Sequence, residues 1–244
     1  MQTSIALELP ETFLKRAELL DTLIPLNPGI SLQLAQNTLF IEEKELHFSG
    51  MDFFPLHLPF KMKEQEMFTI SELNSNLRLE MDEEAIIINM GTLGLISAFT
   101  GLFLTTLVIW NRRKKLGKVF DAQSGHDMLV NGKKIHRMPD IAFHLNEVFK
   151  EKTLDYRLGF PFFCIEVVSN KKSLKQDLRK MANDWMAAGT EIGLVVCPHR
   201  EKYYLFEKDV TGYKTYGFSI VFTHSKLPEL HIDFAAILEE ARGF

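Results

Sequence analysis

The sequence predicts an α/β (α+β) protein built on a central mixed β-sheet with helices on its faces. Two short apolar runs, "FFCIEVVS" and "IGLVVC", have the length and β-branched composition of buried strands. The segment Ser173–Ala188 between them is predicted to be a helix that starts with a capping box (Ser173 with Gln176) and stops at Gly189. Its inner face is formed by apolar residues at helical spacing, namely Leu174, Leu178, Met181 and Trp185. Strands that alternate with helices in this way indicate a sheet covered by helices.

The other elements are expected along the chain as follows. Residues 1–66 form a poorly patterned N-terminal extension, with a helix over "PETFLKRAELLDTL" and two short strands over "TLFIEEKELHF", and the main domain covers residues 67–244. "LRLEM" and "AIIINM" flank the polar "DEE" and indicate a hairpin. Further strands are predicted to begin at Gly117 and to cover "PDIAFHL" and "KYYLFEK", with a turn at Asn131–Gly132.

One long apolar segment allows two interpretations. Ala85–Trp110 carries no charge and is followed by "NRRKK", which is typical of a transmembrane helix. Alternatively, a strand over "AIIINM" ends at Gly91 and Gly94, and a helix follows over Ile96–Trp110. That helix would have roughly 15 residues, fewer than the roughly 20 that span a bilayer. We favour the second interpretation, which predicts a helix packed against the sheet and no membrane partner, and a membrane protein stays the competing class.

Composition limits the class of protein further. The 244 residues carry 28 basic and 32 acidic side chains, so the net charge of −4 excludes a generally cationic surface but not a local basic groove. Cys164 and Cys197 lie in separate apolar runs and are expected to be buried thiols in a reducing compartment. The N-terminus shows no signal-peptide pattern, so a cytoplasmic location is expected.

Two carboxylates are the candidate functional residues. Glu166 lies within an apolar strand, where an unpaired charge costs several kcal/mol by rough estimate. Asp140 follows Pro139 at the start of the preceding strand. Carboxylates on neighbouring strands could share one Mg²⁺ ion, which takes oxygen ligands and keeps several waters. Lys180, on the following helix, could orient a metal-bound water or balance phosphate charge. The alternative is a structural salt bridge of Glu166 with Lys180 or Arg179.

Other polar residues have weaker patterns. Two basic clusters could contact phosphates, although the first could equally be a solvated turn favoured by the helix dipole. They are Arg112, Arg113, Lys114 and Lys115, and then Lys171, Lys172 and Lys175. His126, His136 and His144 lack metal-ligand spacing and are expected in loops or on the surface.

Two segments together resemble a known family. "GKVFDAQSGHDMLVNGKKIHRMPDIAF" and "PFFCIEVVSNKKSLKQDLRKMANDWMAAGTEIGLVVCP" are similar to the putative restriction endonuclease family of the PD-(D/E)XK nuclease superfamily, over about Phe68 to Asp209. The resemblance implies a restriction-endonuclease-like fold and an Mg²⁺-dependent endonuclease that hydrolyses phosphodiester bonds in DNA, with Mn²⁺ as a substitute ion. It also implies that Asp140 and Glu166 are the metal ligands. A homodimer is compatible with it, because two subunits commonly cut the two strands.

The sequence departs from the family pattern at several positions. Val168 stands where the motif lysine is expected. Many relatives instead carry a lysine on the following helix, and Lys180 in "KM" stands at that position. Thr92 and Gly94 match the threonine and glycine that relatives often have in this segment, whereas Leu95 and Thr100 stand where relatives have more polar residues. The competing hypothesis is therefore a catalytically degenerate nuclease-fold protein that binds nucleic acid or a protein partner.

Overall fold

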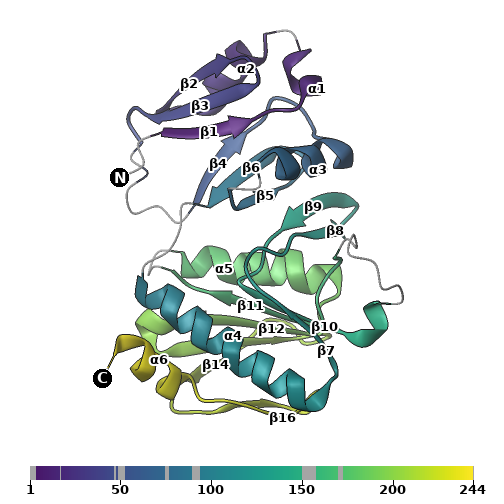
Figure 1. Ribbon diagram of the computed structural model, residues 1–244, viewed down its shortest axis with the longest axis vertical. Coiled ribbons are helices and arrows are strands. Elements are labelled where there is room, and N and C mark those ends of the chain that lie inside the picture. Colours follow the sequence, from purple (N-terminus) through teal and green to yellow (C-terminus); the bar gives the residue numbers. More distant parts are fainter. Residues whose placement is uncertain are drawn as a thin grey trace. The chain divides into compact units, whose positions relative to one another are not determined.

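The computed structural model describes residues 4–16, 18–46, 48, 53–74, 77–89, 94–149, 158–169 and 173–243 (Figure 1). The chain divides into two compact units. Unit 1 contains Met1–Gly91 with Gly132–Arg137, and unit 2 contains Thr92–Asn131 with Met138–Phe244. The predicted boundary between residues 66 and 67 lies inside unit 1, and as a division into domains it stays a prediction.

The first part of unit 1 has a small antiparallel sheet with its own buried side chains. Its strands pair in the order β1-β3-β2. They are β1 (Ser4–Glu8), β2 (Ile30–Ala35) and β3 (Thr38–Glu43), and the helices beside them are α1 (Glu11–Leu14) and α2 (Leu19–Leu26). The helix expected over "PETFLKRAELLDTL" is thus two short helices, and "TLFIEEKELHF" forms one strand rather than two. Leu39 and Ile41 are fully buried, so this region contributes a core that its weak sequence pattern did not predict.

The rest of unit 1 contains a second antiparallel sheet, in which β4, β6, β5 and β9 are neighbours in that order. The elements are β4 (Phe53–His57), α3 (Glu64–Leu73), β5 (Leu79–Met81), β6 (Ala85–Asn89) and β9 (Lys133–Arg137). The predicted hairpin is confirmed, because Leu79 lies opposite Ile88 and Met81 opposite Ile86. Asn131 and Gly132, which precede β9, both have positive φ, as the predicted turn requires.

Unit 2 contains a six-stranded sheet in the order β14-β13-β12-β11-β10-β7. Its strands are β7 (Gly117–Phe120), β10 (Ile141–Leu145), β11 (Phe163–Val167), β12 (Ile192–Cys197), β13 (Lys202–Glu207) and β14 (Lys214–Gly217). Strands β11 and β12 are parallel and the other neighbours antiparallel. The predicted central mixed sheet is therefore confirmed. Shorter elements complete the unit, namely β8 (His126–Val130), η1 (Asn146–Val148), η3 (Pro198–Arg200), β15 (Phe222–His224) and β16 (Leu227–Ile232).

Helices cover both faces of this sheet (Figure 1). Helices α4 (Gly94–Lys114) and α6 (Phe234–Arg242) pack on one face around a large apolar cluster. On the other face, α5 (Leu174–Lys180) continues directly into the π-helical segment η2 (Met181–Met186). Gly193 of β12 lies against the Met181 side chain, and a Cβ atom at Gly193 would collide with it. The missing side chain thus lets the helix lie close to the strand.

Helix α4 confirms one sequence-based expectation and corrects another. Its buried side, which includes Phe99, Phe103 and Leu107, packs into the apolar cluster, as predicted for the segment Ile96–Trp110. The helix has 21 residues, however, so the argument that it is too short to span a bilayer is wrong. Among the described residues, α4 is the helix that is long and apolar enough to cross a membrane, and 28% of its most apolar window is buried inside the protein.

The helix after β11 begins without the predicted capping box. Ser173 has helical backbone angles (φ −74°, ψ −21°), and its side chain makes no capping hydrogen bond. An N-cap residue needs extended angles to direct its oxygen at the free N–H groups, so the S-x-x-Q pattern is not sufficient here. The predicted stop is confirmed, because Gly189 has a φ of +118° that other residues rarely adopt.

Candidate active site

The pairing of β10 with β11 brings the two candidate carboxylates together. Ile141 lies opposite Ile165 in this antiparallel pair, and the same register places Asp140 opposite Glu166. Residues directly opposite each other point to the same face of a sheet, with Cβ atoms about 5 Å apart. Asp140 Oδ2 also accepts a 2.7 Å hydrogen bond from the backbone N–H of Val167. Asp140 and Glu166 therefore lie at the same end of the strand pair, and their role as a common site stays a prediction.

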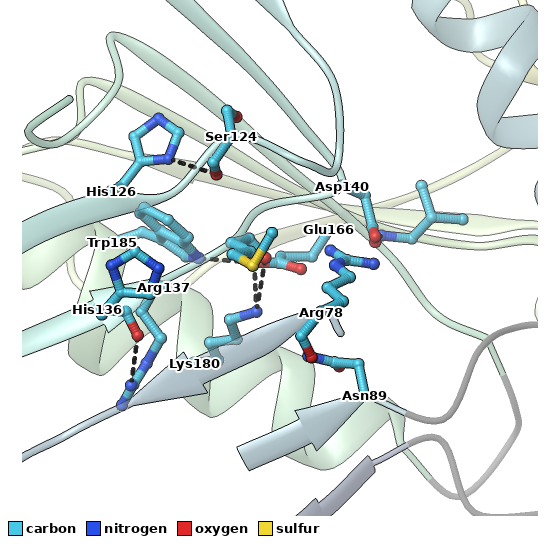
Figure 2. A network of polar contacts seen from close by, with 12 residues as sticks. Arg78, Asn89, Ser124, His126, His136, Arg137, Asp140, Glu166, Lys180 and Trp185 are labelled. Atoms are coloured by element: carbon cyan, nitrogen blue, oxygen red, sulfur yellow. Dashed lines mark hydrogen bonds and ion pairs between the residues drawn. The ribbon is translucent and has the colours of Figure 1, made fainter. Parts of the chain in front are cut away.

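Glu166 is buried, and its charge is offset within unit 2. The residue is 4% exposed, and its Oε1 atom accepts a 2.7 Å hydrogen bond from Trp185 Nε1. The Lys180 ammonium lies 3.0 Å from the same oxygen (Figure 2). The carboxylate thus has a cation and a neutral donor in place of water. This arrangement explains how an acid is accommodated in an apolar strand.

The π-helical segment explains how Lys180 and Trp185 reach one oxygen. In an α-helix, residues five apart lie on different faces, because each turn takes about 3.6 residues. A π-turn, with its i to i+5 hydrogen bonds, puts about one more residue into the turn. Lys180 and Trp185 flank the start and end of such a turn in η2. The predicted inner face of the helix did not include Lys180, yet the π-turn directs Lys180 and Trp185 to the same carboxylate. The ion pair of Glu166 with Lys180, one of the alternatives from the sequence, is found.

Lys180 is also more deeply placed than a solvated helix residue. Its side chain is only 15% exposed, and Nζ lies 3.4 Å from the carbonyl oxygen of Met138, two residues before Asp140. We therefore expect Lys180 to contribute to the stability of the fold. Its loss would leave a buried carboxylate without its cation.

Two histidines extend the polar network, contrary to the expectation that they lie in loops or on the surface. His126 and His144 are fully buried, and their Nε2 atoms are 3.0 Å apart, so one ring donates and the other accepts. Burial lowers the pKa of His144 to about 4, which keeps this ring neutral near pH 7. The His126 ring meets Trp185 edge-on at 5.5 Å between centroids, and its Nδ1 contacts Ser124 (Figure 2). The third histidine of the sequence analysis, His136, is half-buried in strand β9 of unit 1.

The acids present limit the kind of metal site. Across the described parts of the chain, no group of three or more histidine, cysteine or acidic side chains is arranged to hold a metal ion. Two carboxylates provide oxygen ligands that fit Mg²⁺, which is commonly bound by one or two carboxylates and otherwise by water. They do not fit an ion that takes all of its ligands from protein side chains.

The positions that depart from the family pattern add no ligand. Val168 is fully buried, Leu95 is half-buried, and the Thr100 hydroxyl donates to the Ile96 carbonyl of its own helix at 2.8 Å. Helix α4 contains no acidic residue at all. Three residues of the sequence analysis, Thr92, Lys171 and Lys172, lie outside the described residues.

Comparisons with known proteins agree with the fold and with the resemblance. Residues 65–235 match the model of the Uma2 family, described as "Putative restriction endonuclease". A crystal structure of a putative nuclease belonging to DUF820, from Anabaena variabilis, has the same fold with a TM-score of 0.53. The two chains are 14% identical over 66% of this chain and 89% of that chain. A comparison with curated proteins gives no match.

Proposed function

Because the chain belongs to the Uma2 family of putative restriction endonucleases, we propose that it is a metal-dependent endonuclease that hydrolyses phosphodiester bonds in DNA. The observation that supports the proposal is that Asp140, which accepts from Val167 N, lies beside Glu166 where β10 and β11 pair, with the Lys180 ammonium at the Glu166 carboxylate. An acid and a lysine buried together at the end of two strands are costly to the fold, and such groups gather at catalytic sites.

Each residue has a distinct role in this proposal. Asp140 and Glu166 would hold Mg²⁺, or Mn²⁺ in its place. The bound ion would supply charge stabilisation at a phosphate oxygen and a more acidic water. Lys180 would hold the Glu166 carboxylate in position and balance its charge, and its ammonium would add positive charge beside a bound phosphate. Trp185 fixes the same carboxylate from the side through its N–H group.

The proposal is tested with Asp140→Asn and Glu166→Gln, which remove charge while keeping side-chain size. Wild-type protein is expected to cleave plasmid DNA with Mn²⁺, and both variants are expected to lose at least about 10²-fold in rate. Titration calorimetry with Mn²⁺ gives a second readout, since both variants should bind the ion more weakly. Asp209→Asn, in the exposed turn after β13, is the matched control and should behave as wild type in both assays.

The competing hypothesis is a degenerate nuclease fold that only binds DNA or a protein, and Val168, Leu95 and Thr100 are its motivation. It predicts that wild type cleaves no nucleic acid with any divalent ion and that Mn²⁺ binding does not depend on Asp140. The metal-dependent proposal is rejected if both results are obtained with folded protein.

A further inference from the structure

Helix α4 has an outer side that the packing of unit 2 leaves exposed. The residues on this side recur every three or four positions and so form one continuous surface, namely Gly94, Ser97, Ala98, Gly101, Thr105 and Ile109. The helix carries no charged residue before Arg112. A helix side that meets water normally carries charged residues. The outer side of α4 therefore has the composition of a contact surface rather than of a solvated one.

The packing of one chain does not explain the glycine at the centre of this side. A Cβ atom built on Gly101 meets none of the described atoms within 4 Å. Glycine inside a helix is less favourable than alanine, and its usual benefit is the close approach of another backbone. The missing side chain at Gly101 is thus consistent with a second helix against this side of α4.

Helix α6 lies beside α4 and runs in the opposite direction (Figure 1). Near the end of α4, Trp110 Nε1 donates to the Pro228 carbonyl at 2.9 Å. Closer to the middle of α4, the Phe103 ring meets Phe234, the first residue of α6, with centroids 5.2 Å apart. The chain from β16 into α6 therefore passes from the end of α4 toward its beginning. Both helices cover the same face of the sheet, so their exposed sides point away from that face.

The two helices carry opposite free charges at opposite ends of this layer. Two pairs of like charges are exposed in the last turns of α4 and α6, namely Arg112 with Arg113 and Glu239 with Glu240. Among the residues that the structure describes, none of these four side chains has an ion-pair partner. The neighbouring Lys114 is already paired with Glu229. Likewise, Arg242 is paired with Glu201.

We propose that α4 and α6 form the interface of a homodimer, with a two-fold axis across the middle of α4. Such an axis makes the two α4 helices antiparallel, and each contact occurs twice. If the axis passes Leu104, the midpoint of α4, Arg112 of one copy lies level with Ile96 of the other. Glu240 follows Phe234 by about 9 Å along α6, which places it near that same level. The arginines of each copy therefore meet the glutamates of the other.

A second copy is the occupant that this charge pattern selects. An uncharged centre between positive and negative ends is complementary to itself after a two-fold rotation, as an isologous interface requires. Glu166 lies on the other face of the sheet, toward α5 and η2, so the dimer leaves the carboxylates of both copies uncovered by this interface. The inference does not depend on the proposed function.

The test is a charge exchange followed by sedimentation velocity on the full chain. Wild type should sediment with twice the 28.1 kDa mass of one chain. One double variant is Arg112→Glu with Arg113→Glu, and the other is Glu239→Lys with Glu240→Lys. Each should raise the dimer dissociation constant at least about 100-fold, because like charges then meet. An equimolar mixture of the two variants should dimerise again, since opposite charges meet at both ends of the mixed pair.

Two further variants serve as a steric test and a control. Gly101→Trp should be monomeric and keep the wild-type far-UV circular dichroism, because the position has free space in one chain. Lys175→Glu with Arg179→Glu reverses two exposed charges on α5, which covers the other face of the sheet, and should dimerise as wild type does.

Three results would overturn the assignment. The first is a monomeric wild type, and the second is dimerisation of the charge-reversed variants as strong as that of wild type. The third is a mixture of the two variants that stays monomeric. Vesicles of phosphatidylcholine and phosphatidylglycerol test the other use of an apolar helix side. A monomeric wild type that sediments with these vesicles would assign the outer side of α4 to a membrane surface instead.

Discussion

The two faces of the six-stranded sheet are built from the same strands and have opposite chemical character. On the face covered by α4 and α6, β10 and β11 present Ile141, Phe143, Phe163 and Ile165, all fully buried. On the face covered by α5 and η2, the alternate residues of the same strands include His144 and Glu166. Side chains alternate between faces with a period of two. The apolar core therefore packs on one face of the sheet, and the polar network lies on the other.

The difference shows how the protein tolerates costly groups beside its core. The apolar face needs no polar partners, and its contribution follows the surface it buries. On the other face, each buried charge or ring needs a donor or acceptor, and the partners come from η2 and β8. Substitutions on the first face should thus change stability alone, whereas those on the second should couple stability to charge, pH or catalysis.

The largest effect is expected on the apolar face. Phe163 is fully buried and stacks on Phe222 with ring centroids 5.8 Å apart. Phe163→Ala should reduce the free energy of unfolding by about 4 kcal/mol, through lost burial and a cavity. Denaturant titrations measure this change, and cleavage per folded molecule should stay at the wild-type level. A loss of metal binding by folded Phe163→Ala would contradict the separation of the two faces.

Next in size is the ion pair on the polar face. Lys180→Met should lower the free energy of unfolding by about 3 kcal/mol, because Glu166 keeps its burial and loses its cation. Adding Glu166→Gln should restore most of that stability, since the second change removes the unpaired charge. The double-mutant cycle measures this coupling. Additive effects of the two substitutions would mean that the pair contributes no coupling energy.

The sequence predicts these two faces only in part. The apolar strands, and the acid Glu166 within one of them, were sufficient to predict the mixed sheet and to place Asp140 and Glu166 on neighbouring strands. The convergence of Lys180 and Trp185 was not predicted, because helical spacing assumes a regular α-helix and η2 is a π-turn. The burial of His126 and His144 was missed as well. Their contact joins β8 to β10, which are separated in the chain, and no local spacing indicates it.

The histidine pair should make stability depend on pH. The pKa of His144 is about 4 in the folded protein and about 6.5 in an unfolded chain, so the unfolded state binds more protons between these values. Stability is therefore full above pH 6.5 and falls as the pH decreases toward 4, by about 2 kcal/mol between pH 7.5 and 5. His144→Leu should lose this part of the acid sensitivity. His231→Gln, exposed on β16, is the control and should keep it.

The smallest effect separates the two faces most directly, because each carries one tryptophan with a single indole hydrogen bond. Trp110 Nε1 donates to the Pro228 carbonyl at 2.9 Å on the α4 face, and Trp185 Nε1 donates to Glu166 at 2.7 Å on the other. Replacing either by Phe removes one donor and should cost about 1 kcal/mol for the lost hydrogen bond. Only Trp185→Phe should also weaken Mn²⁺ binding, by about 10-fold, because a bond that orients a metal ligand is lost. Mn²⁺ titrations of both variants, with unfolding curves alongside, make the comparison. Equal Mn²⁺ affinities in the two variants would mean that Trp185 only fills space.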